Sequence, residues 1–548
     1  MQGRRWYCAC VALVASLIAA GSAWASPPQP DSTTQPLKDG CQRNPGALLT
    51  KETPEWAYVY NTPAWQPPPA PRWVAGIVSS GNPRFQAVHT SGGDLPTGHD
   101  AYDFNVNILP DPQYAFLLGT ANLAGQGEEA GRLHTEREDN TIPKFAWPEP
   151  GDRIMELGSW VWDCGHWGTP TNVFSPDYVL PHEGQPCPTP GPLGDPRQCT
   201  ITGESTEFHP YRALWDVRAT PVTSPYGESQ GDLFITTNET RAGIEADCAH
   251  AHPPPPGDNA TYGPDYRACL EIEPNWQDVS GDYDFLLNAP PKPAPTAHLE
   301  FRVVDHGSTS NAPEPKLTQY GSDAVRVRFH IDAKPGERLV MGKTIYVGWT
   351  PLPASALPTH VRITYRQLTI HRIMDPGCSL GAPIGSCSLE STRTNQLSTP
   401  PGDWNLYLDA NGVWDQWQPG NGEFLPPSDG TVYQPSDKTT DFYLPQSSGW
   451  RLYVHGRECD LNDIEPDRPM ADCPTNRELA DDNDVPGLIL DLFPSVASSL
   501  GDHSSNALTR SQDPTSTCPD GNPTGCYTLD YRVDVIDDAA ARAASEPR

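Results

Sequence analysis

Histidine and carboxylate residues recur at short spacings in the first half of the chain. Asp163 and His166 lie in the run GSWVWDCGHWGTP, and Glu207 and His209 are two positions apart in STEFHPYRALW. Residues two apart in a β-strand share a face, so Glu207 and His209 can converge on one ligand. Two imidazoles with one or two carboxylates suit zinc, manganese or iron. We therefore predict a transition-metal site formed by Asp163, His166, Glu207 and His209.

The elements that must position these residues are two strands. The segments RIMELGSWVWD and EFHPYRALWDV are expected to pair as antiparallel neighbours across the loop 167–205, which puts the end of one strand beside the start of the other. Side chains on earlier strands could complete the site or orient its ligands, namely His99, Asp103, His134 and Glu136.

A second interpretation of the same residues contains no metal. His166 and His209 would hydrogen-bond buried backbone groups at a covered sheet edge, with the carboxylates as their partners. The chain has no HExxH or comparable ligand spacing that would favour the metal. Both interpretations therefore stay open at this point.

Acidic loops in the last third of the chain form a second candidate site. HGRECDLNDIEPD spans 455–467, ADDNDVPG spans 480–487, and Asp375 lies on an earlier loop. Calcium takes six to eight oxygen ligands from flexible loops, and dense Asp and Asn supplies them. The alternative is a solvated acidic loop in an already acidic protein.

The region 359–538 resembles C2-like β-sandwich domains. The resemblance rests on the strand VRITYRQLTIHRI leading into Asp375, on an Asn-Gly hairpin in DWNLYLDANGVWDQW, and on the acidic loops after LYVHGRECD and before PGLILDLF. In that family, calcium ions sit between aspartate-bearing loops at one end of the sheet. The resemblance implies a calcium site formed by Asp375, Asp460, Asp482 and Asp484.

Twelve cysteines follow residue 25, an even number that predicts up to six disulfides in an exported chain. Proximity in sequence favours the pairs Cys187 with Cys199, Cys248 with Cys269, Cys378 with Cys387, Cys459 with Cys473, Cys518 with Cys526, and Cys41 with Cys164. Cys164 would then be a structural link rather than a metal ligand.

Composition predicts an all-β fold with two antiparallel β-sandwich or barrel domains and long, disulfide-stapled, proline-rich loops. Proline makes up 63 of 548 residues, so helices should be few, and the 16 tryptophans need a core or a ligand. Alternation places Trp160 and Trp162 on one strand face, which favours packing of these side chains in the core.

The expected organisation is a signal peptide at 1–25, a proline-rich arm at 26–72, a first β domain at 73–237, a loop-rich insertion at 238–297, strands at 298–350 that finish that domain or form a small middle one, a C2-like sandwich at 359–538, and a tail at 539–548.

The chain is expected to be exported. Arg4 and Arg5 precede an apolar run that ends in Ala23-Trp24-Ala25, the pattern of a cleaved secretory signal. No later stretch is apolar enough to span a membrane. The net charge of −32 disfavours binding to nucleic acid.

These features favour a secreted binding or structural β protein stabilised by a divalent cation, whose partner is an extracellular ligand such as a cell-surface polymer. The alternative is a secreted metal-dependent enzyme, a hydrolase, that uses Asp163, His166, Glu207 and His209. The sequence contains no GxSxG elbow, phosphate-binding glycine loop or dinucleotide fingerprint that would point to another class of enzyme.

Overall fold

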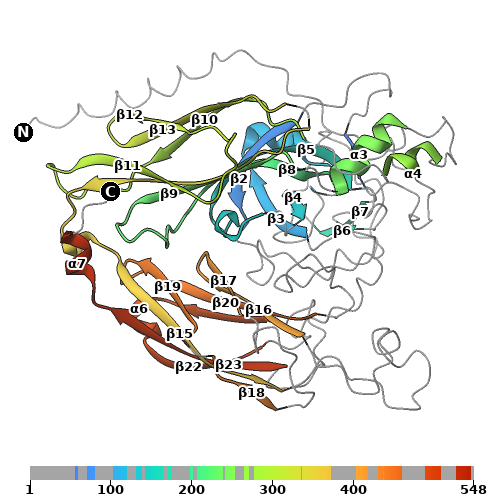
Figure 1. Cartoon of the computed structure of the whole chain (residues 1–548). Helices are drawn as coiled ribbons and strands as arrows, with labels where there is room; N and C mark the ends of the chain where they lie inside the picture. The colour runs from blue at the N-terminus through green and yellow to red at the C-terminus, as the bar shows by residue number, and fades with distance from the viewer. Residues whose placement is uncertain are drawn as a thin grey trace, which may run out of the picture.

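The protein is described by a computed structural model in which two β domains lie side by side (Figure 1). It describes residues 56–59, 71–79, 103–119, 122, 131–138, 142–163, 171–174, 198–201, 206–238, 241–252, 264–270, 277–334, 336–371, 403–417, 430–435, 437–459, 488–507 and 526–544. The described part is mostly β-strand, which confirms the β class expected from composition.

The first domain is built on a nine-stranded sheet. Its strands, in spatial order, are β1 (Trp56–Tyr58), β5 (Arg153–Asp163), β2 (Arg72–Val78), β3 (Asp103–Pro110), β4 (Leu133–Glu138), β8 (Thr206–Val217), β9 (Ser229–Thr236), β14 (Val340–Thr350) and β11 (His298–Asp305). Strand β5 also pairs with β8, so β5, β2, β3, β4 and β8 close into a five-stranded barrel.

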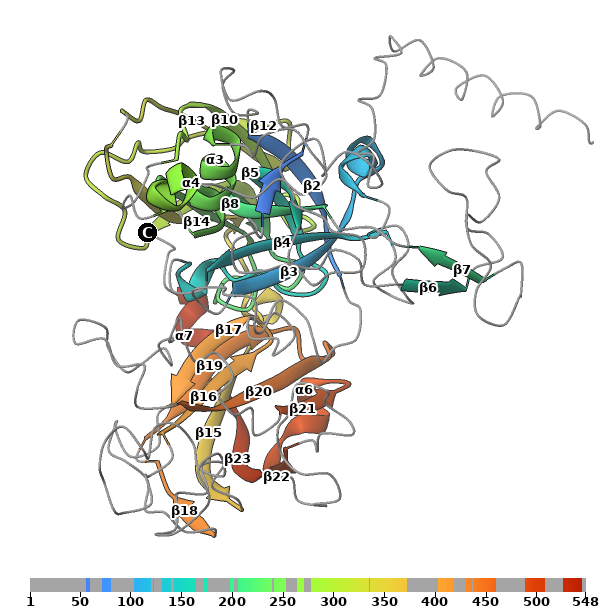
Figure 2. The ribbon, with the colours of Figure 1, turned by 90° about the vertical axis from the view of Figure 1, so that its right-hand side faces the viewer.

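The pairing of β5 with β8 is antiparallel, as the sequence predicts, but the expectation of purely antiparallel domains is wrong in one place. Strands β4 and β8 pair in parallel, whereas every other described strand pair is antiparallel. They come together because β8 completes the barrel between β4 and β5. Strand β4 therefore pairs with a strand far along the chain instead of with the next strand in a hairpin. Figure 2 shows β3 and β4 at the front of the first domain.

A smaller sheet packs against the first domain. It consists of β10 (Gly281–Asn288), β13 (Ala324–Ile331) and β12 (Lys316–Tyr320). Alternate apolar residues of these strands share one core with Trp215, Leu233 and Ile345 of the large sheet. The segment expected to be a loop-rich insertion also contains two helices, α3 (Arg241–Ala251) and α4 (Pro264–Leu270).

The second domain consists of two antiparallel sheets. One contains β18 (Thr431–Tyr433), β15 (Thr359–Ile370), β19 (Thr439–Leu444), β23 (Tyr527–Ile536) and β22 (Gly501–Asn506). The other contains β17 (Val413–Trp417), β16 (Asp403–Ala410), β20 (Trp450–Cys459) and β21 (Leu488–Phe493). Apolar residues from both sheets form one core.

The hairpin predicted at Asn411-Gly412 is confirmed. The two residues join β16 to β17 and have φ angles of +52° and +101°. A type I′ turn needs positive φ at both central positions, and the Asn-Gly pair adopts them at low cost.

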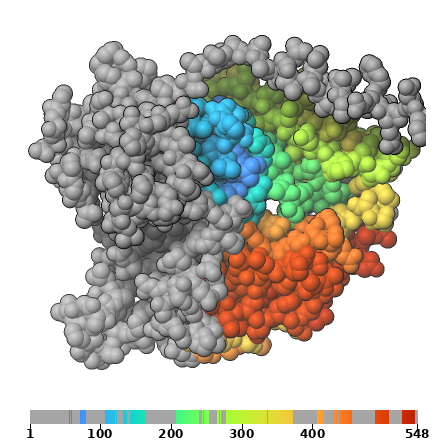
Figure 3. Space-filling view, turned by 180° about the vertical axis from the view of Figure 1, so that it is seen from behind, coloured from blue at the N-terminus to red at the C-terminus, as the bar shows by residue number. Residues whose placement is uncertain are grey.

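The two domains share their cores where they meet, and Figure 3 shows them in contact. Val222 of the first domain packs into the core of the second, and Tyr407 of the second packs into the core of the first. Glu149 forms an ion pair with Arg451 and accepts a hydrogen bond of 2.7 Å from Trp414 Nε1. A cavity of about 160 Å³ lies beside these residues.

The remaining described elements are short. They are η1 (Pro112–Leu117), η4 (Lys144–Ala146), β6 (Thr171–Phe174), β7 (Gln198–Ile201), η5 (Ala354–Ala356), α6 (Val496–Ser499) and α7 (Ala539–Ala544). Among the residues that the structure describes, none of the helices combines the length and the apolar character needed to cross a membrane.

One of the six predicted disulfides lies within the described residues. Cys248 of α3 is bonded to Cys269 of α4, as sequence proximity suggested. The other five predicted pairs each include a cysteine outside the described residues.

Candidate metal centre

The candidate site is built by two neighbouring strands that carry mirrored patterns. Strand β4 contributes His134-Thr135-Glu136, and strand β8 contributes Glu207-Phe208-His209. The parallel register puts His134 opposite Glu207 and Thr135 opposite Phe208. Alternation along each strand therefore turns His134, Glu136, Glu207 and His209 to one face. On that face, each histidine has one glutamate neighbour on its own strand and one on the adjacent strand.

The opposite face of these strands explains why the pattern is stable. Leu133 and Phe208 point into the barrel core, where they pack with Val106 and Ile108 of β3. Because successive strand residues point to opposite faces, burial of these apolar residues directs the four polar ones outward. A one-residue slip in register would exchange the two sets, so the core fixes the site.

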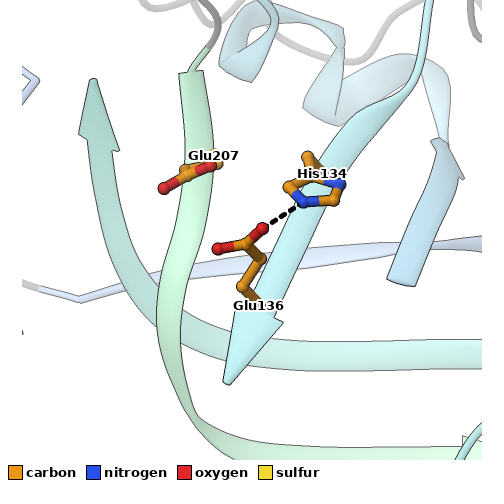
Figure 4. A group of neighbouring side chains, drawn as sticks. All are labelled: His134, Glu136 and Glu207. Atoms are coloured by element: carbon orange, nitrogen blue, oxygen red, sulfur yellow. Dashed lines mark hydrogen bonds and ion pairs between the residues drawn. The ribbon is translucent and has the colours of Figure 1, made fainter. Parts of the chain in front are cut away.

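The four polar side chains contact one another directly. His134 Nε2 and Glu136 Oε1 form a short contact, which Figure 4 shows as a dashed line. His209 Nδ1 lies 2.9 Å from Glu136 Oε2 and 3.4 Å from Glu207 Oε1. One ligand atom each from His134, Glu136 and Glu207 fall within 4.8 Å of one another.

Three of the four side chains are almost completely buried. Glu136 and Glu207 are 2% exposed and His209 is 1% exposed. The side chain of His134 is 27% exposed, so the site is open to solvent on that side.

The buried side of the site is covered by β1 and α3. The ring of Trp56 meets the ring of His209 edge to face, with 4.8 Å between their centroids. Trp56, Tyr58 and Val161 form a small apolar cluster with Ala246 of α3. Tyr58 donates a 2.7 Å hydrogen bond to Asp247 Oδ1, which ties β1 to the helix.

The electrostatics of Glu136 reflect its two histidine neighbours. Burial by itself favours the neutral carboxyl, but His134 and His209 outweigh it and hold the pKa of Glu136 well below its ordinary value. Glu136 is therefore an anion at neutral pH despite its burial. A buried carboxylate is stable only when a cation or several hydrogen-bond donors compensate its charge.

The residues fit a divalent transition metal. A tetrahedral zinc ion with bonds of about 2.1 Å places its ligand atoms about 3.4 Å apart. The ligand atoms of His134, Glu136 and Glu207 lie within 4.8 Å of one another, and His209 Nδ1 lies 2.9 and 3.4 Å from the two carboxylates. Imidazoles and carboxylates together are a mixed nitrogen and oxygen set that zinc, manganese and iron accept.

The structure brings together part of the predicted set. Glu207 and His209 lie in the site, joined by His134 and Glu136, which the sequence offered only as completing or orienting residues. Asp163 ends β5 and its backbone pairs with Trp56, but its side chain lies outside the described part, as do His166 and His99. The signal that could have ranked His134 and Glu136 higher is the mirrored spacing of HTE and EFH.

The predicted calcium site involves a different part of the chain. Asp375, Asp460, Asp482 and Asp484 lie outside the described residues, so the calcium site stays a prediction. The packing role expected for Trp160 and Trp162 is confirmed, because both are buried in the barrel core.

No protein-family model matches this sequence, and the search of curated proteins finds no match.

Proposed function

We propose that this chain is an exported β protein that binds one transition-metal ion through His134, Glu136, Glu207 and His209. The observation that carries the proposal is that His134, Glu136 and Glu207 each offer a ligand atom within 4.8 Å of the others, while His209 contacts both glutamates. A metal ion at this position would compensate the charge of the two buried glutamates that the histidines contact. The metal-free alternative is a set of histidine–glutamate contacts that simply join β4 to β8.

A binding or structural role follows from the burial of the site. Three of its four side chains are almost inaccessible, which suits an ion that links β4 to β8 and stabilises the barrel. Together with the expected export signal, this supports the function of a binding or structural protein outside the cell. A calcium site in the C-terminal loops is a compatible addition.

The test is the metal content of the full chain. We expect about one tightly held zinc, manganese or iron ion per chain, measured by plasma mass spectrometry after exhaustive dialysis. Because each ligand atom contributes directly to the coordination, Glu136→Gln and His209→Gln should both lose the ion.

A matched control is His360→Gln. His360 is also a buried histidine between two carboxylates, 3.2 Å from Asp441 and 2.7 Å from Asp538, but no second imidazole lies among these contacts. This variant should keep its metal. A wild-type chain with no bound metal, or equal metal content in the site variants and the wild type, would rule out the proposed function.

A metal-dependent enzyme is the second candidate, and the exposure of His134 favours it. A catalytic ion keeps a coordination position for water or substrate, whereas a structural ion is closed. Cobalt substitution distinguishes the two. A change in the visible spectrum of the cobalt-loaded chain on adding azide would indicate an open position, and an unchanged spectrum would argue against catalysis at this ion.

A further inference from the structure

Asn107 lies next to the exposed histidine of the candidate site. It is directly opposite His134 in the antiparallel pairing of β3 with β4. Its Oδ1 is 2.9 Å from His134 Nδ1, a hydrogen bond in which the ring N–H donates to the amide oxygen. Neither the metal ligands proposed above nor the barrel core includes this side chain.

The contact decides which nitrogen of His134 is available to a metal. In a neutral imidazole one nitrogen carries the proton and the other has the free electron pair. An acceptor at Nδ1 keeps that proton in place, so Nε2 is the nitrogen that loses its proton and offers an electron pair when a metal binds. That nitrogen is the one that contacts Glu136, on the side where Glu207 also lies.

His134 needs this support more than the other members of the site. Glu136, Glu207 and His209 are held by burial, and the ring of His209 also packs against Trp56. The side chain of His134 is 27% exposed, so packing restrains its ring less. The hydrogen bond at Nδ1 restricts rotation of the His134 ring about its side-chain torsions, which packing restrains less.

We propose that Asn107 is the positioning residue of this site. It holds His134 so that Nε2 faces the metal and the His134 ring closes the solvent-exposed side of the site. The inference rests on the proposed metal site. Orienting partners of metal-bound histidines typically change metal affinity 10- to 100-fold when they are removed. Loss of Asn107 acts mainly on dissociation, because a free His134 ring lets the ion leave towards solvent.

The experiment compares Asn107→Leu with Asn107→Asp in the full chain, using zinc as the probe. Leucine has the same branched shape without the acceptor, and aspartate keeps an acceptor oxygen. We expect Asn107→Leu to bind zinc 10- to 100-fold more weakly, with a faster release of zinc to a chelator, and Asn107→Asp to stay within a few-fold of the wild type. Asn311→Leu, which removes an amide whose contacts are with Glu337 and Arg338, should leave zinc binding unchanged.

A spectroscopic measurement separates positioning from simple packing. In the zinc-loaded chain with 15N-labelled histidine, the ring signals of His134 should show a protonated Nδ1 and a zinc-bound Nε2. Asn107→Leu should give a mixture of ring states or lose this pattern. If Asn107→Leu does not fold, Asn107→Ala replaces it in both measurements.

The outcomes distinguish this inference from the function on which it rests. Wild-type chain that binds no zinc, manganese or iron removes the metal site and the inference together. Tight zinc binding in the wild type, with equal affinity in Asn107→Leu, overturns the inference alone. Equal losses in Asn107→Leu and Asn107→Asp would also overturn it, because the acceptor oxygen would then be irrelevant.

Discussion

The barrel domain and the sandwich domain bury different kinds of side chain. The sandwich core is almost entirely apolar, from Val361 and Ile363 on one sheet to Leu406 and Leu408 on the other. The barrel domain buries a large set of charged groups: Glu136, Arg137, Glu156, Glu207, Asp216, Arg218, Asp232 and Lys343. Apolar burial stabilises without further partners, whereas each buried charge needs a counter-charge, a proton or a ligand.

This difference indicates where chemistry belongs in the molecule. Buried ionisable groups lower the stability of the fold unless they are compensated. Their concentration in one domain therefore says more about where a functional site lies than their number in the whole chain. In the sandwich, Asp409 is the described carboxylate that is fully buried, and it contacts Arg451 at the border with the barrel domain. Among the described residues, buried charges are therefore concentrated in the barrel domain, where the candidate metal centre lies.

The largest expected effect concerns Arg218, the centre of the buried charges. Its guanidinium contacts Asp152, Asp216 and Asp232 at 3.1, 3.0 and 2.6 Å. Arg218→Met leaves three buried carboxylates without their counter-charge and should lower the free energy of unfolding by at least 3–5 kcal/mol. Urea unfolding followed by tryptophan fluorescence measures this loss.

The sandwich offers the matched comparison. Arg362 forms a similar ion pair with Asp441, at 2.7 Å, but both side chains are partly exposed. Arg362→Met should cost about 1 kcal/mol or less, because exposed ion pairs are screened by water. Similar losses in the two variants would remove the contrast between the domains.

A somewhat smaller effect is expected for Glu156, whose carboxyl group lies inside the barrel. Its Oε1 accepts a 3.3 Å hydrogen bond from Thr135, and burial raises its pKa to about 8. The folded chain therefore holds this proton more tightly than the unfolded chain. Its contribution to stability is complete below about pH 4.5 and is lost as the pH rises through about 8.

Glu156→Gln should remove this pH dependence. At pH 8 the variant should be more stable than the wild type by on the order of 4 kcal/mol, with little difference near pH 4.5. Unfolding curves between pH 4.5 and 8.5 measure the difference, and Glu300→Gln on an exposed strand serves as the control. A constant difference across this range would show that Glu156 has an ordinary pKa.

The smallest expected effect concerns the contact between the domains at Gly412. Its φ is +101°, and an added Cβ would come within 3.1 Å of Glu149 Cγ in the barrel domain. Gly430 has a φ of +85° and no described heavy atom within 4 Å of an added Cβ. Gly412→Ala should cost about 2 kcal/mol and Gly430→Ala about 1 kcal/mol, since only the first adds crowding to backbone strain. Thermal unfolding compares them, and equal costs would mean that the hairpin tip yields freely.

The sequence predicted local structure well where one strand or turn carries the whole signal. Alternation identified β8 and the shared face of Glu207 and His209, and the Asn-Gly pair identified the hairpin between β16 and β17. The antiparallel pairing of β5 with β8 also followed, because both strands have long apolar patterns. Each of these depends on neighbours in sequence or on the period of a strand.

The partners of Glu207 and His209 could not be selected in the same way. From the sequence, His134 and Glu136 are only completing residues, because an adjacent strand is expected to supply Asp163 and His166. The parallel contact of β4 with β8 arises from closure of the barrel, which depends on the packing of five strands together. Nothing in the sequence singles out Asn107, since a single asparagine in DFNVNILP carries no signal until its strand partner is known.

The sequence alone determined the β class, the spacing that puts Glu207 and His209 on one face, and the tight turn at Asn411-Gly412. These properties follow from local backbone geometry, which each short segment carries in its own residues. Only the tertiary structure decided that HTE and EFH lie side by side in parallel register, because strand pairing across distant segments is set by burial of the common core. Which side chains meet at the candidate metal centre is therefore a consequence of how the barrel closes.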